Sequence, residues 1–214
     1  MYIGVTAPAF VGAQLPFAEE IEAFRKMDSM QFPPRGANLL IGSSSFTRWT
    51  DVQAYFPGYT IVNRGFGGST LVDVIRYLPQ VALQYHPGKI FIYCGENDFA
   101  SSDTVTVDMV VSRFKTLFNM LRVAMPKIGI VYVSMKPSPA RWQFAKKYAE
   151  GNLRIKRFLQ QKKHTAFVNV VNEMLDETGK PNGKLFIADS LHMNATGYAI
   201  WKNKLIKYFI PNKK

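Results

Sequence analysis

Short apolar runs alternate with longer amphipathic stretches along most of the chain. Five runs rich in Ile, Val, Phe and Tyr have the length of buried strands, and they cover residues 37–42, 59–63, 89–94, 128–135 and 165–171. Helical spacing of apolar residues marks the stretches 16–30, 69–85, 105–125, 141–163 and 194–209. Strands that alternate with helices predict βαβ units and a parallel sheet covered on both faces. We therefore expect an α/β protein, a three-layer α/β/α sandwich around a five-stranded parallel sheet.

Polar and glycine-rich segments follow the first three of these strands. They read Gly42-Ser43-Ser44-Ser45, Asn-Arg-Gly-Phe-Gly-Gly-Ser-Thr at 63–70 and Gly-Glu-Asn-Asp at 95–98. A fourth polar segment, Asp-Ser-Leu-His-Met-Asn at 189–194, precedes the last predicted helix. In open parallel sheets, ligands bind outside the carboxyl ends of the strands. The polar residues of this chain are therefore gathered where such a sheet places its site.

These segments contain the residue types that acyl transfer needs. A serine on a strand-to-helix turn supplies a nucleophile, and its own N–H can face the negative charge that develops on a carbonyl oxygen. Gly68, which has no side chain, can bring a second backbone N–H close, and Asn97 can offer a side-chain N–H. Asp189 and His192 are three residues apart, so one short turn can hold both while the carboxylate fixes the imidazole tautomer.

The four segments, taken in this order, resemble the SGNH/GDSL hydrolase superfamily of esterases and acylhydrolases. The family's first block, Gly-Asp-Ser, is similar to Gly42-Ser43-Ser44, and its second-block glycine matches Gly68. Its Gly-x-Asn-Asp block matches residues 95–98 in full, and its Asp-x-x-His block matches residues 189–192. The resemblance runs from about Leu39 to the last helix. It implies a flavodoxin-like sheet topology and a serine hydrolase that uses no metal or other cofactor.

The family pattern also distinguishes the three consecutive serines. Its nucleophile stands two residues after the glycine, which selects Ser44. Ser43 takes the position that aspartate usually holds, and this departure does not touch the implied triad. Ser45 is expected to begin the following helix, where a serine can cap free N–H groups.

The resemblance assigns the catalytic roles to Ser44, Asp189 and His192, and the oxyanion hole to Ser44, Gly68 and Asn97. Asp98 is expected to brace its loop rather than to react. Each motif also has a simpler interpretation when it stands alone: a serine that caps a helix, a glycine turn, and an Asx turn at residues 97–98. The presence of all four blocks in order favours the catalytic interpretation.

The expected activity is hydrolysis of short-chain esters, with O-acetyl groups on carbohydrate among the candidate substrates. The sequence shows no extended lipid-binding segment, and the loops between its predicted elements are short. Lysophospholipase or thioesterase-like activity, and a catalytically silent carbohydrate-binding domain, remain the alternatives. The expected partner is a small-molecule or carbohydrate ester, and the sequence indicates no oligomeric state.

The composition adds a strong positive charge, +12 at neutral pH, and a pI of about 9.8. The basic residues are spread along the chain without an aromatic-interleaved platform, so we expect no nucleic-acid partner. The single cysteine, Cys94, excludes an internal disulfide and is expected to be a small buried residue. The three histidines are far apart in sequence and show no metal-ligand spacing, so no metal site is expected.

The chain has 214 residues, a length typical of one domain. We expect residues 1–14 to be an N-terminal arm or the remnant of a secretory signal, and residues 15–214 to form a single SGNH-hydrolase domain. A signal remnant favours a secreted or periplasmic location over a cytoplasmic one. The chain contains no run of about 20 apolar residues, the length of a membrane-spanning helix, so stable membrane insertion is not expected.

Overall fold

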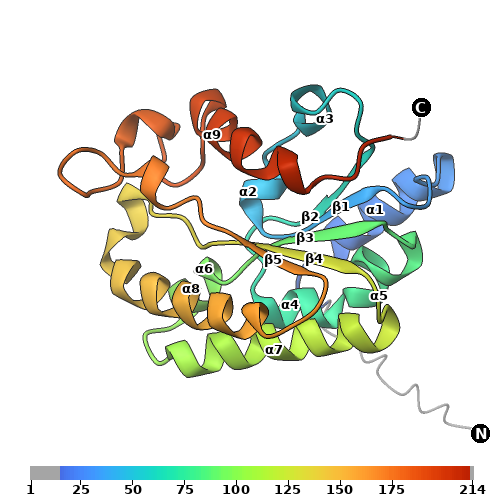
Figure 1. Ribbon diagram of the computed structural model, residues 1–214, viewed down its shortest axis with the longest axis horizontal. Helices are drawn as coiled ribbons and strands as arrows, with labels where there is room; N and C mark the ends of the chain where they lie inside the picture. The colour runs from blue at the N-terminus through green and yellow to red at the C-terminus, as the bar shows by residue number, and fades with distance from the viewer. Residues whose placement is uncertain (1–14, 213–214) are drawn as a thin grey trace, which may run out of the picture.

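Five parallel strands form the centre of the protein, whose computed structural model describes residues 15–212 (Figure 1). The strands lie in the order β2-β1-β3-β4-β5. Their bounds are β1 (Asn38–Gly42), β2 (Ile61–Gly65), β3 (Lys89–Tyr93), β4 (Gly129–Val133) and β5 (Thr165–Val168). The predicted five-stranded parallel sheet is therefore confirmed, and residues 1–14 lie outside the described part.

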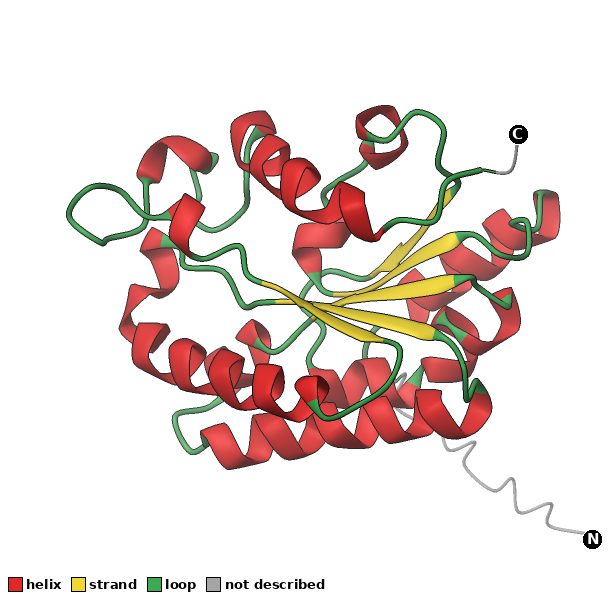
Figure 2. Ribbon diagram, viewed as in Figure 1, coloured by secondary structure: helices red, strands yellow, loops and turns green. Residues whose placement is uncertain are grey.

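Helices cover both faces of the sheet (Figure 2). One face carries α1 (Ala18–Met30), α4 (Leu71–Arg76), α5 (Leu78–Val81), α6 (Glu96–Ser101), α7 (Val107–Ala124) and α8 (Ala145–Gln160). The other carries α2 (Ser44–Thr47), α3 (Val52–Tyr55) and α9 (Ala195–Leu205). Short 3₁₀ helices complete the chain: η1 (Leu83–Tyr85), η2 (Pro139–Phe144), η3 (Asn172–Met174), η4 (Gly183–Leu185) and η5 (Ile206–Tyr208). The three layers are those that the sequence pattern predicts.

Alternate residues of each central strand enter two separate hydrophobic cores. In β1, Leu39 and Ile41 pack in the core beneath α4 and α7, whereas Leu40 packs in the core beneath α9. Because successive side chains of a strand point to opposite faces, a sheet covered on both sides needs apolar residues at every position. All five residues of β1 are buried, which explains the apolar run Leu39-Leu40-Ile41 at its centre.

Two predicted helices begin or continue differently in the structure. The stretch 69–85 is divided into α4, α5 and η1 rather than forming one helix. Pro79 has no N–H to bond to the carbonyl of Ile75, and its ring crowds the preceding turn, so the helix breaks before it. In the stretch 141–163, the first residues belong to η2, in which Arg141 has a non-helical φ of −126°, and the α-helix begins only at Ala145.

The strand order changes direction at β1. From β1 the chain runs to β2 on one side, and β3 then pairs with β1 on the other side. A ligand crevice forms outside the carboxyl ends of the strands at such a switch point. Gly42 ends β1 there with a φ of +124°, and a Cβ on it would lie 2.0 Å from the Tyr93 carbonyl oxygen. A glycine is therefore required where the chain leaves the sheet for Ser43.

Among residues 15–212, no helix combines the length and the apolar character needed to cross a bilayer.

Candidate active site

Ser44 lies on the turn between β1 and α2, at the switch point of the sheet. Ser43 is the N-cap of α2 in an extended conformation, and Ser44 is the first helical residue. The prediction that Ser45 begins the helix is thus wrong by one residue, because the chain turns directly after the cap. Ser43 and Ser45 are buried, whereas Ser44 is partly exposed. Of the three hydroxyls, that of Ser44 is the one open to solvent.

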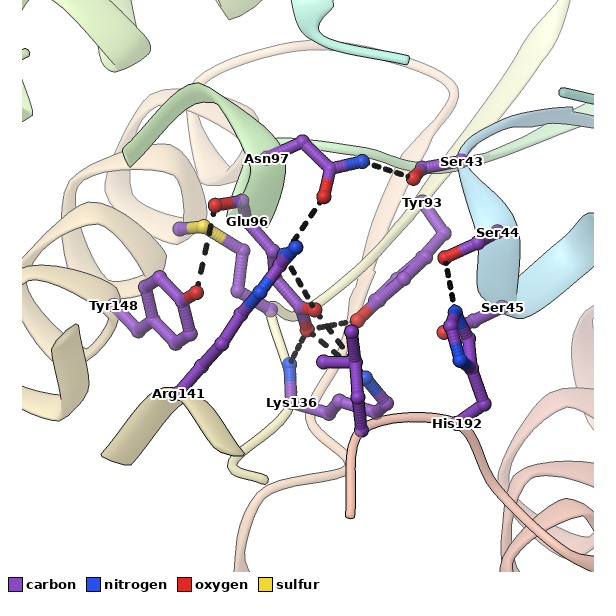
Figure 3. A network of polar contacts seen from close by, with 12 residues as sticks. Ser43, Ser44, Ser45, Tyr93, Glu96, Asn97, Lys136, Arg141, Tyr148 and His192 are labelled. Carbon is purple, nitrogen blue, oxygen red and sulfur yellow. Dashed lines mark hydrogen bonds and ion pairs between the residues drawn. The ribbon is translucent and has the colours of Figure 1, made fainter. Parts of the chain in front are cut away.

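His192 and Asp189 meet Ser44 from the segment that precedes α9. The His192 Nε2 atom lies 3.0 Å from the Ser44 Oγ atom (Figure 3). The His192 Nδ1 atom lies 2.6 Å from Asp189 Oδ2. The structure therefore brings together three residues whose extremes are 148 positions apart in sequence. Hydrogen-bond contact from a hydroxyl to an imidazole to a carboxylate is the arrangement that activates a serine nucleophile.

The turn that holds Asp189 and His192 is fixed by hydrogen bonds from backbone N–H groups to the Asp189 carboxylate. Asp189 Oδ1 accepts from the backbone N–H groups of Leu191 and His192, each at 2.9 Å. Burial alone would raise the pKa of Asp189, but the His192 N–H and imidazole and the Leu191 N–H outweigh it and hold that pKa well below its ordinary value. Ser190, within this turn, has a left-handed φ of +56°. The carboxylate therefore stays ionised in mildly acidic solution, with one oxygen left for the imidazole.

Two backbone N–H groups near Ser44 are candidates for an oxyanion site. Gly68 is exposed and has a φ of +84°, in the left-handed region that favours glycine. A Cβ on the preceding residue, Gly67, would lie 3.9 Å from the Ser44 Cβ, which places this loop beside the serine. Within the described part of the chain, the N–H groups of Ser44 and Gly68 have no hydrogen-bond acceptor. Both donors are therefore available to a substrate oxygen.

Asn97, the third candidate donor, is the second residue of α6 and is buried beneath the β1–α2 turn. Its Nδ2 atom donates to the Ser43 Oγ atom at 2.6 Å (Figure 3). It also donates to the Ser69 carbonyl oxygen, at 2.9 Å. Its Oδ1 atom accepts from Arg141 at 2.7 Å. The amide is therefore held against Ser43, the residue before Ser44, and one of its N–H groups faces the hydroxyl of Ser43.

Asp98 braces the loop, as expected from the sequence. Its Oδ2 atom accepts from the Leu71 N–H at the start of α4, at 2.9 Å, and its Oδ1 atom accepts from Arg113 at 2.8 Å. Burial raises the pKa of Asp98, and the Leu71 N–H and Arg113 oppose that effect. This carboxylate ties α4 and α7 to the segment that carries Asn97.

A buried polar network behind Asn97 was not predicted from the sequence. Glu96 accepts from the Tyr93 hydroxyl and from the Lys136 backbone N–H, the latter at 3.0 Å. The Lys136 Nζ atom lies 3.2 Å from Glu96 Oε2, and the lysine side chain is only 1% exposed. The signal that could have revealed it is the polar segment Lys-Pro-Ser-Pro-Ala-Arg at 136–141, directly after a predicted strand.

The other sequence candidates take structural positions. Burial raises the pKa of the Cys94 thiol far above its ordinary value, which agrees with the predicted small buried residue. Trp49 and Trp201 are fully buried in the core beneath α9. His86 and His164 are exposed, and each precedes the amino end of a strand rather than following its carboxyl end. In residues 15–212, no group of three His, Cys, Asp or Glu side chains is placed to hold a metal ion.

A protein-family model and several solved structures match this chain. The model of the GDSL-like lipase/acylhydrolase family matches residues 36–200, most of the chain. The chain belongs to this family. No curated protein gives a significant sequence match. Members of this family are acylhydrolases that typically cleave esters.

Solved structures share the fold of this family member at low sequence identity. A candidate acylhydrolase from Bacteroides fragilis is 18% identical over 87% of this chain and 94% of its own, with a TM-score of 0.77. A GDSL-like lipase from Bacteroides thetaiotaomicron is 18% identical over 88% and 96% of the two chains, with a TM-score of 0.76. A catalytic mutant of an acetylxylan esterase from Geobacillus stearothermophilus is 16% identical over 85% and 99%, with a TM-score of 0.63. At these identities the likeness establishes the fold alone.

Proposed function

We propose that this chain is a serine esterase with Ser44 as its nucleophile. The observation that carries the proposal is the hydrogen-bonded line from Ser44 Oγ to His192 Nε2, at 3.0 Å, and from His192 Nδ1 to Asp189 Oδ2, at 2.6 Å. A serine hydroxyl is a weak nucleophile until a base in hydrogen-bond contact removes its proton. The partial exposure of Ser44 leaves room for a substrate carbonyl.

The reaction then proceeds in two acyl-transfer steps. His192 takes the Ser44 proton as the hydroxyl oxygen attacks the ester carbonyl, and it gives that proton to the departing alcohol. Water next attacks the acyl-enzyme, with His192 again acting as the base, and the carboxylic acid leaves. Throughout, the ionised Asp189 holds the Nδ1–H of His192 and stabilises the imidazolium that forms.

The negative charge on the carbonyl oxygen is received by the N–H groups of Ser44 and Gly68 and by the side chain of Asn97. The two backbone donors have no acceptor within residues 15–212, which supports this role. One Asn97 N–H is held by the Ser69 carbonyl oxygen, and the other faces Ser43 in the free protein. The N–H that faces Ser43 is the one that can be shared with the oxyanion.

Short-chain esters, including O-acetyl groups on carbohydrate, are the proposed substrates. The fold is shared with structures described as an acetylxylan esterase and an acetyl esterase, and this likeness supports acetyl esters. The second candidate is a longer or bulkier apolar ester of the lysophospholipid or thioester type. A mostly apolar cavity of about 370 Å³ favours this second candidate, and its walls include Met135, Trp142 and Tyr148. The Tyr148 hydroxyl also contacts the backbone of Glu96, the residue before Asn97, so the cavity lies near the candidate active site.

Replacement of the nucleophile tests the activity. Ser44→Ala should lower the kcat for nitrophenyl acetate by several orders of magnitude, because no other described hydroxyl contacts His192. Ser112→Ala is the control: it removes the hydroxyl of an exposed serine of α7, outside the candidate site, and should leave the activity within about 2-fold of the wild type. Both variants are compared with the wild type by circular dichroism to confirm folding. Undiminished turnover by a folded Ser44→Ala variant would refute the proposal.

A series of nitrophenyl esters from acetate to decanoate tests the substrate class. We expect kcat/KM to be highest for acetate and propionate and to fall as the acyl chain lengthens. A maximum at octanoate or decanoate would instead support the second candidate. Labelling with an organophosphonate distinguishes both candidate esterase activities from a catalytically silent binding domain, since only an activated serine reacts with the reagent. An unlabelled wild-type protein would overturn the esterase proposal itself.

A further inference from the structure

Arg141 and Asn97 form a contact that fixes the orientation of the Asn97 amide. The Arg141 Nη1 atom donates to Asn97 Oδ1 at 2.7 Å (Figure 3). Asn97 Nδ2 in turn donates to the Ser69 carbonyl oxygen at 2.9 Å. A guanidinium group can only donate hydrogen bonds, and a carbonyl oxygen can only accept them. A flipped amide would therefore lose both contacts at once. Only one orientation remains, with Nδ2 on the side of the β1–α2 turn.

The guanidinium of Arg141 lies closer to this amide than to the carboxylate of Glu96, with which it also forms an ion pair. The guanidinium lies 2.7 Å from Asn97 Oδ1 but 3.8 Å from Glu96 Oε2. Glu96 is already engaged with the Lys136 Nζ atom at 3.2 Å, with the Lys136 N–H and with the Tyr93 hydroxyl. The Arg141 side chain is only 18% exposed, so solvent screens the interaction weakly. A charge-assisted bond to Oδ1 polarises the amide and strengthens its N–H groups as donors.

The segment that carries Arg141 also contacts the turn that carries His192. Arg141 lies in η2, where its N–H donates to the Ser138 carbonyl oxygen at 3.2 Å. The N–H of the neighbouring Ala140 donates to the carbonyl oxygen of Ser190, at 3.1 Å. Ser190 stands between Asp189 and His192. One short 3₁₀ helix thus links both halves of the candidate active site.

We propose that Arg141 is a positioning residue for the oxyanion site, where it holds and polarises the Asn97 amide so that Nδ2–H meets the reacting carbonyl oxygen. The proposal rests on the proposed esterase function. It differs from a role in substrate binding, because Arg141 acts through Asn97 and needs no contact with the substrate. Arg141 stabilises the transition state, in which the carbonyl oxygen carries negative charge. Its loss should therefore lower kcat and leave KM almost unchanged.

The test uses nitrophenyl acetate, an uncharged substrate that offers no anionic group to an arginine. Arg141→Gln should lower kcat by about 10- to 100-fold and leave KM within about 3-fold of the wild type. This drop in kcat is smaller than the one that follows removal of an oxyanion donor itself, because Asn97 is still present. Arg141→Lys keeps a cationic donor and should recover part of kcat. Arg154→Gln is the matched control, because it removes an exposed guanidinium of α8 with the same change in charge. An unchanged kcat in folded Arg141→Gln, or a change in KM alone, would overturn the proposal.

A double-mutant cycle shows whether Arg141 acts through Asn97. In an Asn97→Ala background, Arg141→Gln should cost less than about 2-fold in kcat, since the amide that it orients is gone. An equal loss in both backgrounds would contradict the proposal and indicate an independent role for the arginine. Arg141→Lys, tested in both backgrounds, gives the same answer where the glutamine variant folds poorly.

A measurement without turnover separates this proposal from the proposed function. The side-chain amide signals of Asn97, assigned in a nitrogen-15 NMR spectrum, should shift and broaden in Arg141→Gln and keep their positions in Arg154→Gln. Signals that stay unchanged in Arg141→Gln would overturn the positioning role even in an active enzyme. Wild-type protein that is inert toward esters and organophosphonates would refute the esterase function, whatever the amide signals show.

Discussion

At the scale of single residues, the three serines after β1 show how a shift of one position changes what a hydroxyl meets. The Ser44 Oγ atom contacts His192, the Ser43 Oγ atom accepts from Asn97, and Ser45 is buried beside Tyr93. An extended cap residue followed at once by a helix points successive side chains in different directions. The contacts of Ser43 also explain how the chain tolerates a serine where the family usually has aspartate: a hydroxyl suffices to accept the Asn97 N–H.

Asp189→Asn tests the role of the carboxylate without disturbing the turn. The amide oxygen of asparagine can still accept from the Leu191 and His192 N–H groups, as Asp189 Oδ1 does. Its NH₂ group, however, would donate to the imidazole Nδ1 and force the proton onto Nε2, so that His192 could no longer accept the Ser44 proton. We expect kcat for nitrophenyl acetate to fall by about 10³- to 10⁴-fold, as in serine proteases with the same change.

Asp176→Asn is the control for this variant. Asp176 also uses Oδ1 to accept backbone N–H groups in an exposed turn, from Thr178 at 2.8 Å and Lys180 at 3.1 Å. It lies outside the candidate site, so its replacement should leave kcat within about 2-fold of the wild type. If both variants lost the same activity, the effect would belong to the loss of a surface charge and not to the imidazole tautomer.

At the scale of elements, the strands could be predicted because their burial leaves a direct mark on the sequence. Strands such as β3 and β4 have a side chain in a core at nearly every position, which produces the continuous apolar runs. Helix ends were harder to predict than strands. Pro79 lacks an N–H and divides the stretch 69–85, although the helical spacing of apolar residues continues across it. Periodicity reports which face is buried and not whether the backbone is unbroken.

Only those residues of the candidate site that lie in a recognisable sequence motif could be predicted. The polar segments that contain Ser44, Asn97 and His192 stand out in the sequence, and the switch point at β1 brings their elements together. Lys136 and Arg141 lie in the polar segment at 136–141, but no motif in the sequence indicates that they contact Glu96 and Asn97. Their contacts depend on the path of the chain from β4 to η2, which no repeat in the sequence specifies.

At the scale of the whole molecule, the polar groups buried in the two cores set a limit on alkaline stability. The hydroxyl of Tyr132 donates to the Cys94 carbonyl oxygen at 2.8 Å, in the layer between the sheet and α7. Burial raises the pKa of Tyr132 and of Tyr93 far above the ordinary value of 10.0, and nearby acidic groups add to the effect. Burial also raises the pKa of Tyr148. These phenols are held neutral by the fold.

Linkage gives the direction of the pH dependence. In the unfolded chain each of these phenols ionises near pH 10, whereas in the folded protein it keeps its proton to higher pH. The unfolded state therefore loses protons first, and the free energy of unfolding falls as the pH rises above about 10. We expect the ultraviolet absorbance of tyrosinate to rise in two stages, the second coinciding with loss of the circular dichroism signal. Full ionisation of all 10 tyrosines in a protein with a native spectrum would contradict this.

Tyr132→Phe separates the two consequences of a buried phenol. At neutral pH the variant should be less stable by about 1–2 kcal/mol, because the Cys94 carbonyl loses its hydrogen-bond donor. Above pH 10 its free energy of unfolding should fall less steeply, because one group with a raised pKa is gone. Urea unfolding at pH 7, 9, 10 and 11 measures both effects, and the two stability curves should converge as the pH rises. Parallel curves would mean that Tyr132 ionises equally in the folded and unfolded states.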